Sequence, residues 1–140
     1  MRIMGIDYGD SRIGIAVSDP MGWTAQGLET ITEKKQEKVF ERLLELIKLY
    51  NVEKIVVGFP KNMNGTIGPR GELTHKFIEN LRQKTGIEIV LWDERLTTVA
   101  AHRMLNETNV RGKKRKQVVD TVAAGYILQG YLDSLKLNRD

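Results

Sequence analysis

The order of strand-like and helix-like segments is the feature that most constrains the fold of this chain. Two apolar, β-branched runs over residues 2–8 and 12–19 are separated by a short segment containing Gly, Asp and Ser, which favours a tight antiparallel hairpin. The run Ile55-Val56-Val57-Gly58-Phe59 is apolar throughout, as expected of a parallel strand buried on both faces. A sheet containing such a strand needs helices on both faces.

The remaining segments complete a mixed five-stranded α/β sheet. A more polar strand is expected at 27–32 and a last strand at 87–92. Apolar positions at helical spacing predict helices over residues 34–50, about 70–84, 97 or 98 to 105, and 116–135. This order predicts three antiparallel meander strands, then two parallel strands joined by crossover helices. No repeat or linker interrupts residues 1–140, so one domain is expected.

Composition narrows the class of protein. The chain has 140 residues, enough to bury roughly two-thirds of the surface that its unfolded form exposes. It contains no cysteine, which excludes a disulfide scaffold and a thiolate zinc site and is compatible with a reducing cytosol. It shows no signal-peptide pattern and no apolar stretch approaching the ~20 residues of a membrane span. A cytoplasmic protein without a membrane partner is expected.

Three carboxylates occur where their neighbours are apolar. Asp7 shares its side-chain parity with Gly5 on a strand expected to be central. Glu94 follows the strand at 87–92, at the carboxyl end where open α/β sheets place their sites. Asp120 heads the apolar stripe of the last helix. Acids brought together in this way need cations among them, most simply Mg²⁺ or Mn²⁺, which indicates metal-assisted phosphoryl chemistry.

Each acid also has a purely structural interpretation. Asp7 could cap the turn that follows it. Glu94 could form a loop ion pair with Arg95, and Asp120 could be a first-turn residue favoured by the helix dipole. Other polar residues near element ends are predicted to be turn or surface residues: Asp10, Asp19, His75 and His102.

Positive charge is concentrated in one segment. The net charge is +4, and five cations fall between Arg111 and Lys116, in a predicted loop before the last helix. Such a cluster attracts polyanions and typically contacts nucleic-acid phosphates. The alternative is an ordinary solvated loop and helix start.

Four segments, in order along the chain, resemble a known family. Residues 5–19, which begin Gly-Ile-Asp-Tyr-Gly, resemble the opening motif of the YqgF family. Residues 57–66, 93–101 and 120–128 resemble its second, third and fourth motifs. Members of that family are assigned as Holliday-junction resolvases or as nucleases that mature the end of small-subunit ribosomal RNA.

The resemblance implies an RNase H-like fold in which Asp7, Glu94 and Asp120 are the catalytic, metal-binding carboxylates. The implied activity is metal-dependent phosphodiester hydrolysis in structured nucleic acid, either at the 5′ end of precursor small-subunit ribosomal RNA or at Holliday junctions. Junction resolvases of related fold carry a second acid one turn along the final helix. Here that turn offers Ala123 and Ala124, which leaves three acids to hold one or two metals.

Substrate contacts are predicted on loops expected to reach the same edge of the sheet. The predicted contact residues are Arg12, Lys61, Asn62, Asn64, Thr66, Arg70, Arg111, Lys113, Lys114, Arg115 and Lys116. The expected partner is RNA or branched DNA, bound by a monomer or homodimer that associates with ribosomal particles.

Two rival interpretations use the same fold. The first is a non-catalytic nucleic-acid or ribosome-associated binding protein, which would keep the basic cluster but bind divalent metal weakly. The second starts from Asp7 and Gly9, which also resemble the phosphate-binding hairpin of sugar kinases and actin-like ATPases. Those proteins need two such lobes, and this chain has the length of one and lacks a P-loop pattern.

Overall fold

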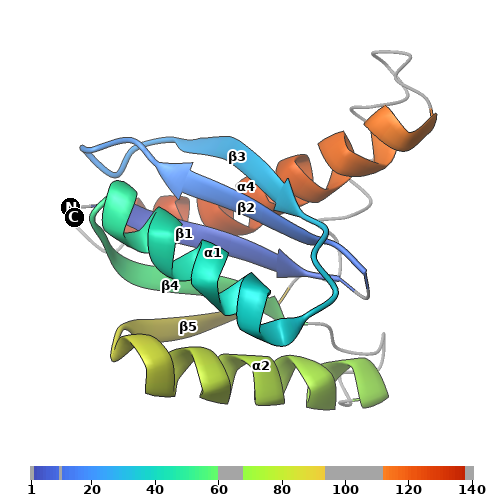
Figure 1. The fold of residues 1–140 in the computed structure, drawn as a ribbon. Helices are drawn as coiled ribbons and strands as arrows, with labels where there is room; N and C mark the ends of the chain where they lie inside the picture. Colours follow the sequence, from blue (N-terminus) through green and yellow to red (C-terminus); the bar gives the residue numbers. More distant parts are fainter. Residues whose placement is uncertain (1, 10, 60–67, 94–111, 138–140) are drawn as a thin grey trace.

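A computed structural model describes residues 2–9, 11–59, 68–93 and 112–137 of this protein (Figure 1). Eight helices and strands are described there. They are β1 (Arg2–Tyr8), β2 (Ile13–Ser18), β3 (Ala25–Ile31), α1 (Gln36–Leu49), β4 (Val52–Phe59), α2 (Pro69–Thr85), β5 (Glu88–Asp93) and α4 (Gly112–Leu137). None of the helices in these ranges is long and apolar enough to cross a membrane.

The five strands form one mixed sheet in the order β3-β2-β1-β4-β5, with β1 at its centre. β1, β2 and β3 pair antiparallel, and β4 is parallel to both β1 and β5. The predicted meander followed by two parallel strands is therefore confirmed. Strand β4 begins at Val52, three residues before the predicted run, because Glu53 and Lys54 interrupt the apolar pattern that marks its buried half.

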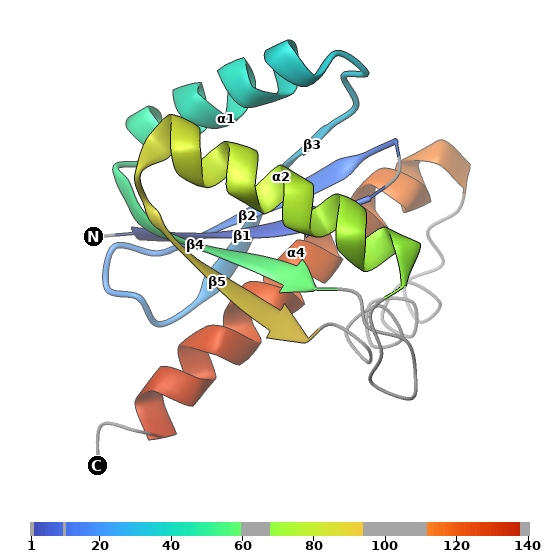
Figure 2. The ribbon, with the colours of Figure 1, turned by 90° about the horizontal axis from the view of Figure 1, so that it is seen from below.

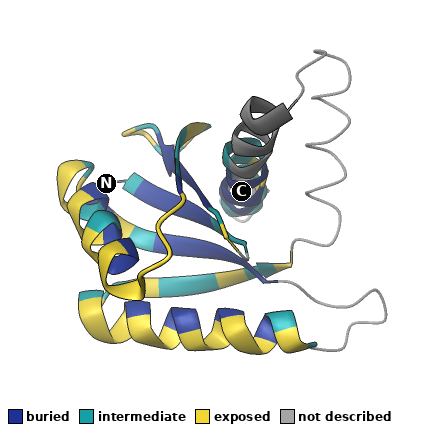
Figure 3. Ribbon diagram, turned by 45° about the vertical axis from the view of Figure 1, so that its right-hand side comes forward, coloured by how far each residue is buried: buried dark blue, intermediate teal, exposed yellow. Residues whose placement is uncertain are grey.

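Helices cover both faces of the sheet, as predicted. α1 and α2 lie on one face, and the single long helix α4 crosses the other (Figures 1 and 2). On α1 and α2 the buried residues follow the side that faces the sheet, and exposed residues follow the outer side (Figure 3). This is the pattern that amphipathic helices make when they bury one stripe against a sheet.

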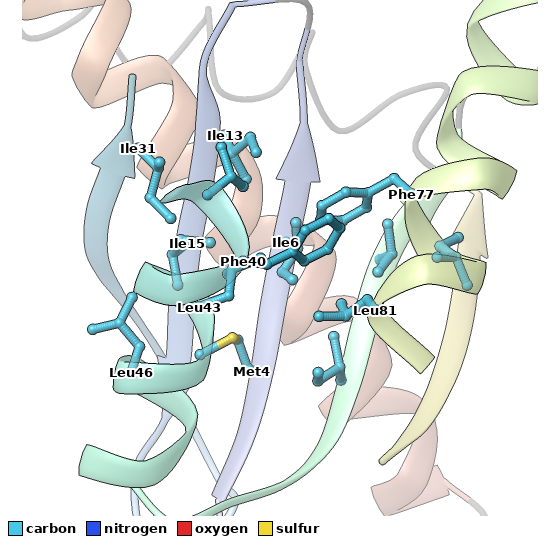
Figure 4. Close-up of a cluster of buried hydrophobic side chains, with 14 of the residues drawn as sticks. Met4, Ile6, Ile13, Ile15, Ile31, Phe40, Leu43, Leu46, Phe77 and Leu81 are labelled. Carbon is cyan, nitrogen blue, oxygen red and sulfur yellow. The ribbon is translucent and has the colours of Figure 1, made fainter. Parts of the chain in front are cut away.

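The face under α1 and α2 holds the larger core cluster, which consists of bulky side chains (Figure 4). Met4 and Ile6 of β1, Leu43 of α1 and Leu81 of α2 are fully buried in it. Such interdigitated aliphatic and aromatic side chains supply most of the hydrophobic stabilisation of a domain of this size.

The face under α4 is lined by small residues where the helix crosses the strands. A Cβ atom added to Gly5 of β1 would lie 2.7 Å from Cβ of Leu128 and 2.9 Å from the carbonyl oxygen of Ala124. One added to Gly27 of β3 would lie 3.2 Å from Cβ of Thr121. These small residues permit the close approach of α4 to the strands.

The start of α4 differs from the prediction. The helix begins at Gly112 rather than near residue 116, so Lys113, Lys114, Arg115 and Lys116 lie in its first turns and not in a loop. Lys and Arg are good helix formers, and like-charge pairs one turn apart cost only a few tenths of a kcal/mol each. Clustered charge was therefore a poor signal for a loop. The helix predicted at 97 or 98 to 105 lies outside the described residues.

Asp19 holds the turn between β2 and β3, as predicted. Its Oδ1 accepts hydrogen bonds from the backbone N–H groups of Trp23 at 2.7 Å and Thr24 at 2.9 Å. The hydrogen bond from Thr24, supported by that from Trp23, lowers the pKa of the Asp19 carboxyl below its ordinary value. Its charged form therefore stabilises the turn.

Candidate functional site

Asp7 lies near the end of the central strand, on the α4 face of the sheet. Side chains alternate along β1, and the α4 face takes Ile3, which joins the core cluster under α4, and Gly5, which contacts Leu128. Asp7 has the same parity and is partly buried. The parity predicted from the sequence is confirmed, and the carboxylate stands where a strand end meets a helix.

Glycines flank Asp7 on both neighbouring strands. Gly14 of β2 is the Cα partner of Asp7. On the other side, Ile6 of β1 is paired with Val57 of β4, so the next residue of each strand brings Gly58 level with Asp7. The two immediate neighbours of Asp7 along this row of the sheet are therefore glycines, which add no side-chain bulk. A carboxylate is a hard oxygen ligand of the kind that Mg²⁺ prefers, and glycine neighbours do not crowd its coordination sphere, so these residues fit Mg²⁺-like ions.

The path of α4 brings the position of Asp120 toward Asp7. Thr121 lies against Gly27, and Tyr131 lies at the opposite end of the sheet, where its hydroxyl accepts a 3.0 Å hydrogen bond from Lys54. Residues before Thr121 therefore lie toward the carboxyl end of β1 (Figures 1 and 2). Asp120 is one turn before Ala124, which contacts β1, and residues four apart share a helix face.

The third predicted acid, Glu94, lies outside the described residues. The residue before it, Asp93, ends β5 and pairs with Phe59 at the end of β4. β1, β4 and β5 run parallel, so their carboxyl ends lie at the same edge of the sheet (Figure 2). On β5 the indole of Trp92 faces α4, where it meets the ring of Tyr131 edge-on at 6.2 Å, so Asp93 has the opposite parity.

Within the part of the chain that the structure describes, no group of three His, Cys, Asp or Glu residues stands at metal-binding distance. Of the three predicted ligands, Asp7 has a described side chain, Asp120 has a described backbone in α4, and Glu94 has neither. The structure thus brings two of the three positions to one end of the sheet.

Arg70 is fastened to the end of β1, a contact that the sequence did not predict. It lies in the first turn of α2, donates a hydrogen bond to the carbonyl oxygen of Tyr8, and holds its guanidinium 4.7 Å from the centre of the Tyr8 ring. The same ring stacks on Phe77 at 4.2 Å. Since Tyr8 follows Asp7 directly, this clamp fixes the backbone beside the carboxylate and brings a cation near it.

The other predicted contact residues divide into three groups. Arg12 lies in the turn between β1 and β2, where its carbonyl oxygen accepts a 2.9 Å hydrogen bond from the N–H of Gly9. For the cluster Lys113–Lys116 the structure gives the helical backbone only. Lys61, Asn62, Asn64, Thr66 and Arg111 lie outside the described residues.

Lysines at the start of α1 form a surface that sequence reasoning missed. Lys34, Lys35 and Lys38 line an open groove between the end of β3 and the start of α1. Their signal in the sequence was weak, because the run from Glu33 to Lys38 mixes both signs of charge and is typical of a solvated helix start. Only the fold brings Lys34 to a cavity that Tyr8 also lines.

Comparison with solved structures defines the class of protein. The fold resembles *Thermus thermophilus* RuvC in a complex with a Holliday junction substrate, with a TM-score of 0.63, 14% identity, and coverage of 99% of this chain and 97% of that one. It also resembles the fowlpox virus Holliday junction resolvase, with a TM-score of 0.57, 14% identity, and coverage of 96% and 99%. At these identities the likeness establishes the fold, which is the RNase H-like fold of RuvC.

The sequence identifies the family. Residues 1–134 match the RuvX family of Holliday junction resolvases, and the chain belongs to that family. This confirms the resemblance to YqgF. Proteins of *Bacillus cytotoxicus* and *Bacillus mycoides* are each 60% identical over 136 residues, covering 96% of this chain and 99% of their own length. Both carry the provisional name pre-16S rRNA nuclease.

Proposed function

We propose that this protein is a divalent-metal-dependent nuclease that hydrolyses phosphodiester bonds in structured RNA, with the 5′ end of precursor small-subunit ribosomal RNA as its substrate. One observation carries the proposal. Asp7 lies between two glycines at the end of the central strand, on the face of the sheet that is covered by α4, the helix that bears Asp120. The names of the relatives at 60% identity support the choice of substrate.

In this proposal Asp7, Glu94 and Asp120 hold the metal, as Mg²⁺ or Mn²⁺. When bound, the metal would lower the pKa of a water nucleophile and neutralise charge that develops on the phosphate. The contribution of the chain is positional. β1 is the central strand, and the clamp of Arg70 on Tyr8 holds the residue beside Asp7 in place. The expected products carry a 5′-phosphate and a 3′-hydroxyl.

Glu94 rather than Asp93 is the proposed third ligand. Trp92 faces α4 and Asp93 has the opposite parity, so Asp93 belongs to the other face from Asp7. Glu94→Gln should therefore lose cleavage by more than about 100-fold, since removing even an outer contact of a metal site costs about 10–100-fold. Asp93→Asn is the matched control and should change cleavage only slightly. Equal losses in both variants would contradict the assignment.

The basic start of α4 is the proposed phosphate contact nearest the metal. Cations in the first turns of a helix oppose its dipole, and none of the first-turn residues of α4 is acidic. A bound polyanion would relieve both that conflict and the mutual repulsion of Lys113–Lys116. We propose that a cytoplasmic monomer or homodimer binds precursor ribosomal particles in this way, with Arg12, Lys61, Asn62, Asn64, Thr66, Arg70 and Arg111 as further contacts.

The decisive experiment measures cleavage of three end-labelled substrates: precursor 16S ribosomal RNA, unstructured single-stranded RNA, and a four-way DNA junction. Each is incubated with wild type, Asp7→Asn, or the control Glu53→Gln, in Mg²⁺, in Mn²⁺ and in EDTA. Glu53 is exposed on β4, near the opposite end of the sheet. We expect metal-dependent cutting of the precursor RNA by wild type and Glu53→Gln, and none by Asp7→Asn.

Other outcomes lead to other functions. Preferred cutting of the DNA junction would make junction resolution the activity, in keeping with the family description. Binding of nucleic acid without cutting in any metal would favour a non-catalytic binding protein on the same fold. Cutting that survives Asp7→Asn would come from another protein in the preparation.

A further inference from the structure

A cavity lies at the carboxyl edge of the sheet, on the α1 side and thus across the sheet from the α4 face that carries Asp7. It has a volume of about 240 Å³. Its floor is apolar and comes from Ile13, Ile31 and Val39, which are all buried. Tyr8 forms one wall, and Arg12 and Lys34 stand at its rim.

A wider groove with a volume of about 630 Å³ adjoins the cavity along the start of α1. The two share Ile31, Glu33 and Lys34 among their lining residues. We call the cavity and the adjoining groove together the depression, and at its cavity end it is lined by Tyr8, the residue next to Asp7. The depression continues past Lys35 and Lys38.

Ion pairs among the described residues balance only part of the charge in the groove. Arg42 is neutralised, since it bonds both carboxylate oxygens of Glu29 at 2.7 and 2.9 Å and also Glu45 at 2.8 Å. In contrast, no ion pair within the described ranges involves Lys34, Lys35 or Lys38. Three ammonium groups thus follow one another along the path that leaves the cavity.

Glu33 is the one carboxylate at the junction of cavity and groove, and it is bound to the backbone. Its Oε1 accepts hydrogen bonds from the N–H groups of Lys34 at 3.1 Å and Lys35 at 3.2 Å. These bonds, the one from Lys35 foremost, together with the charge of Lys38, lower the pKa of Glu33. One carboxylate stands against three lysines, so the depression as a whole favours an anion.

We propose that this depression binds a single-stranded stretch of the nucleic-acid substrate, with one nucleoside in the cavity and the adjoining phosphates along Lys34, Lys35 and Lys38. The proposal rests on the proposed nuclease function. The cavity is smaller than the roughly 300–1,000 Å³ of sites for drug-sized ligands, so it suits one nucleoside and excludes a duplex. Sites for single strands combine a basic groove that follows the backbone with side chains on which bases pack, usually aromatic rings. Here the basic groove is present, and an aliphatic floor takes the place of the rings.

The position of Tyr8 connects this depression to the cleavage site. Tyr8 lines the cavity and Asp7 faces α4, so the two sites lie on opposite sides of one strand end. A strand leaving Asp7 would cross the β1–β2 hairpin to reach the cavity. The ring of Tyr8 already stacks on Phe77 and carries Arg70, so the base would pack on the aliphatic floor and discriminate weakly between bases.

The first test removes one base at a time from the substrate. A fluorescein-labelled RNA hairpin with a single-stranded extension, and its DNA equivalent, carry an abasic residue at successive positions. Binding is measured by anisotropy in the Asp7→Asn background, which leaves the substrate uncut. We expect one position at which the missing base weakens binding roughly tenfold, as when about 50 Å² of apolar surface fails to leave water.

Filling the cavity should abolish that effect. Ser11 and Gln36 are exposed residues that line the cavity, so Ser11→Leu and, as a second variant, Gln36→Leu should occupy it without disturbing the core. In either variant the abasic substrate should bind as tightly as the intact one. A scan with no sensitive position, or a sensitivity that both filled variants retain, would overturn the cavity as a nucleoside site.

The second test measures the salt dependence of binding. Replacing Lys34, Lys35 and Lys38 together by Gln should reduce the slope of log K against log salt by about 2, since each single-strand phosphate contact contributes roughly 0.7. The control replaces Lys48, Lys76 and Lys84 by Gln, which removes the same charge from exposed positions elsewhere on α1 and α2. Equal slopes in the two triple variants would remove the groove from the binding surface.

The two binding tests can fail or succeed independently of the cleavage test of the nuclease proposal. Cleavage of intact substrate by wild type tests the nuclease alone. If wild type cuts but both binding tests fail, the nuclease stands without this site. If both binding tests succeed but no metal supports cutting, the depression belongs to a binding protein.

Discussion

The two faces of the sheet are built from different kinds of residues, although the same five strands supply both. The face under α1 and α2 holds bulky side chains such as Ile6, Leu43 and Leu81, which fill the space beneath two helices. The face under α4 holds Gly5 and Ala16 at its centre, so that one helix can approach the strands closely. The face under α1 and α2 thus supplies most of the packing that stabilises the fold, and the face under α4 sets the position of the helix that forms the site.

The difference is sharpest at the carboxyl end of β1. Tyr8 points to the bulky face and ends in a stack with Phe77, whereas Asp7 points to the small face, between Gly14 and Gly58. Adjacent residues of one strand thus close a core on one side and open a polar site on the other. Mutations on the two faces should separate folding from activity.

Leu81→Ala should have the largest effect on stability. Leu81 is fully buried between α2 and the sheet, and removing such a side chain costs about 2–5 kcal/mol of unfolding free energy. Cleavage per folded molecule should remain near the wild-type value, because α4 and Asp7 lie on the other face. Urea unfolding and an activity assay well below the transition check both. A fall in cleavage per folded molecule would contradict the view that the two faces separate stability from activity.

Gly5→Ala should produce a smaller loss of stability and a larger loss of activity. The new Cβ would stand 2.7 Å from Cβ of Leu128 and 2.9 Å from the Ala124 carbonyl oxygen, so α4 has to shift, at about 1–3 kcal/mol. Because the shift moves the helix that bears Asp120, cleavage per folded molecule should fall and the Mg²⁺ concentration for half-maximal rate should rise. Full activity with unchanged metal dependence would mean that the close approach of α4 does not set the site.

Asp19→Asn should have the smallest effect on stability, and only at pH values at which the carboxyl of Asp19 is charged. The pKa of Asp19 is lowered in the folded state, so its charge stabilises the turn above the unfolded pKa, near 3.8, and this contribution disappears as the pH falls through the folded pKa. The variant keeps a hydrogen-bond acceptor, so it isolates the charge. Unfolding midpoints of the two proteins should differ at pH 6, and the difference should shrink as the pH falls below the unfolded pKa. A constant difference would assign the effect to packing.

Much of this fold could be predicted because its signals are local. A pattern of only a few residues was enough to predict three elements: the hairpin after Tyr8, the apolar run of β4 and the stripe on α4. The parity of Asp7 followed from simple alternation along β1. Strand ends were predicted to within about two residues except at β4, where charged residues at its exposed start weakened the pattern.

The parts that could not be predicted depend on distant segments. The helical start of α4 was missed because four consecutive cations carry no helix signal other than propensity. The clamp of Arg70 on Tyr8 joins residues 62 apart, and the lysine-lined groove needs the end of β3 to lie beside the hairpin. The assignment of Glu94 stays a prediction, as do the contacts predicted from residues 61–66 and Arg111.

α4 lies close against Gly5 and Gly27, and these contacts can act as a pivot about which the rigid helix tilts. Its first nine residues precede Thr121 and extend past the strand ends, a reach of about 13 Å at 1.5 Å per residue (Figure 1). A tilt of about 10° about that pivot would move the N-terminal end of α4 by roughly 2 Å, whereas Asp120, which lies beside the pivot, would move far less. The cationic tip could therefore swing to follow the curvature of a bound strand without disturbing the carboxylate near the pivot.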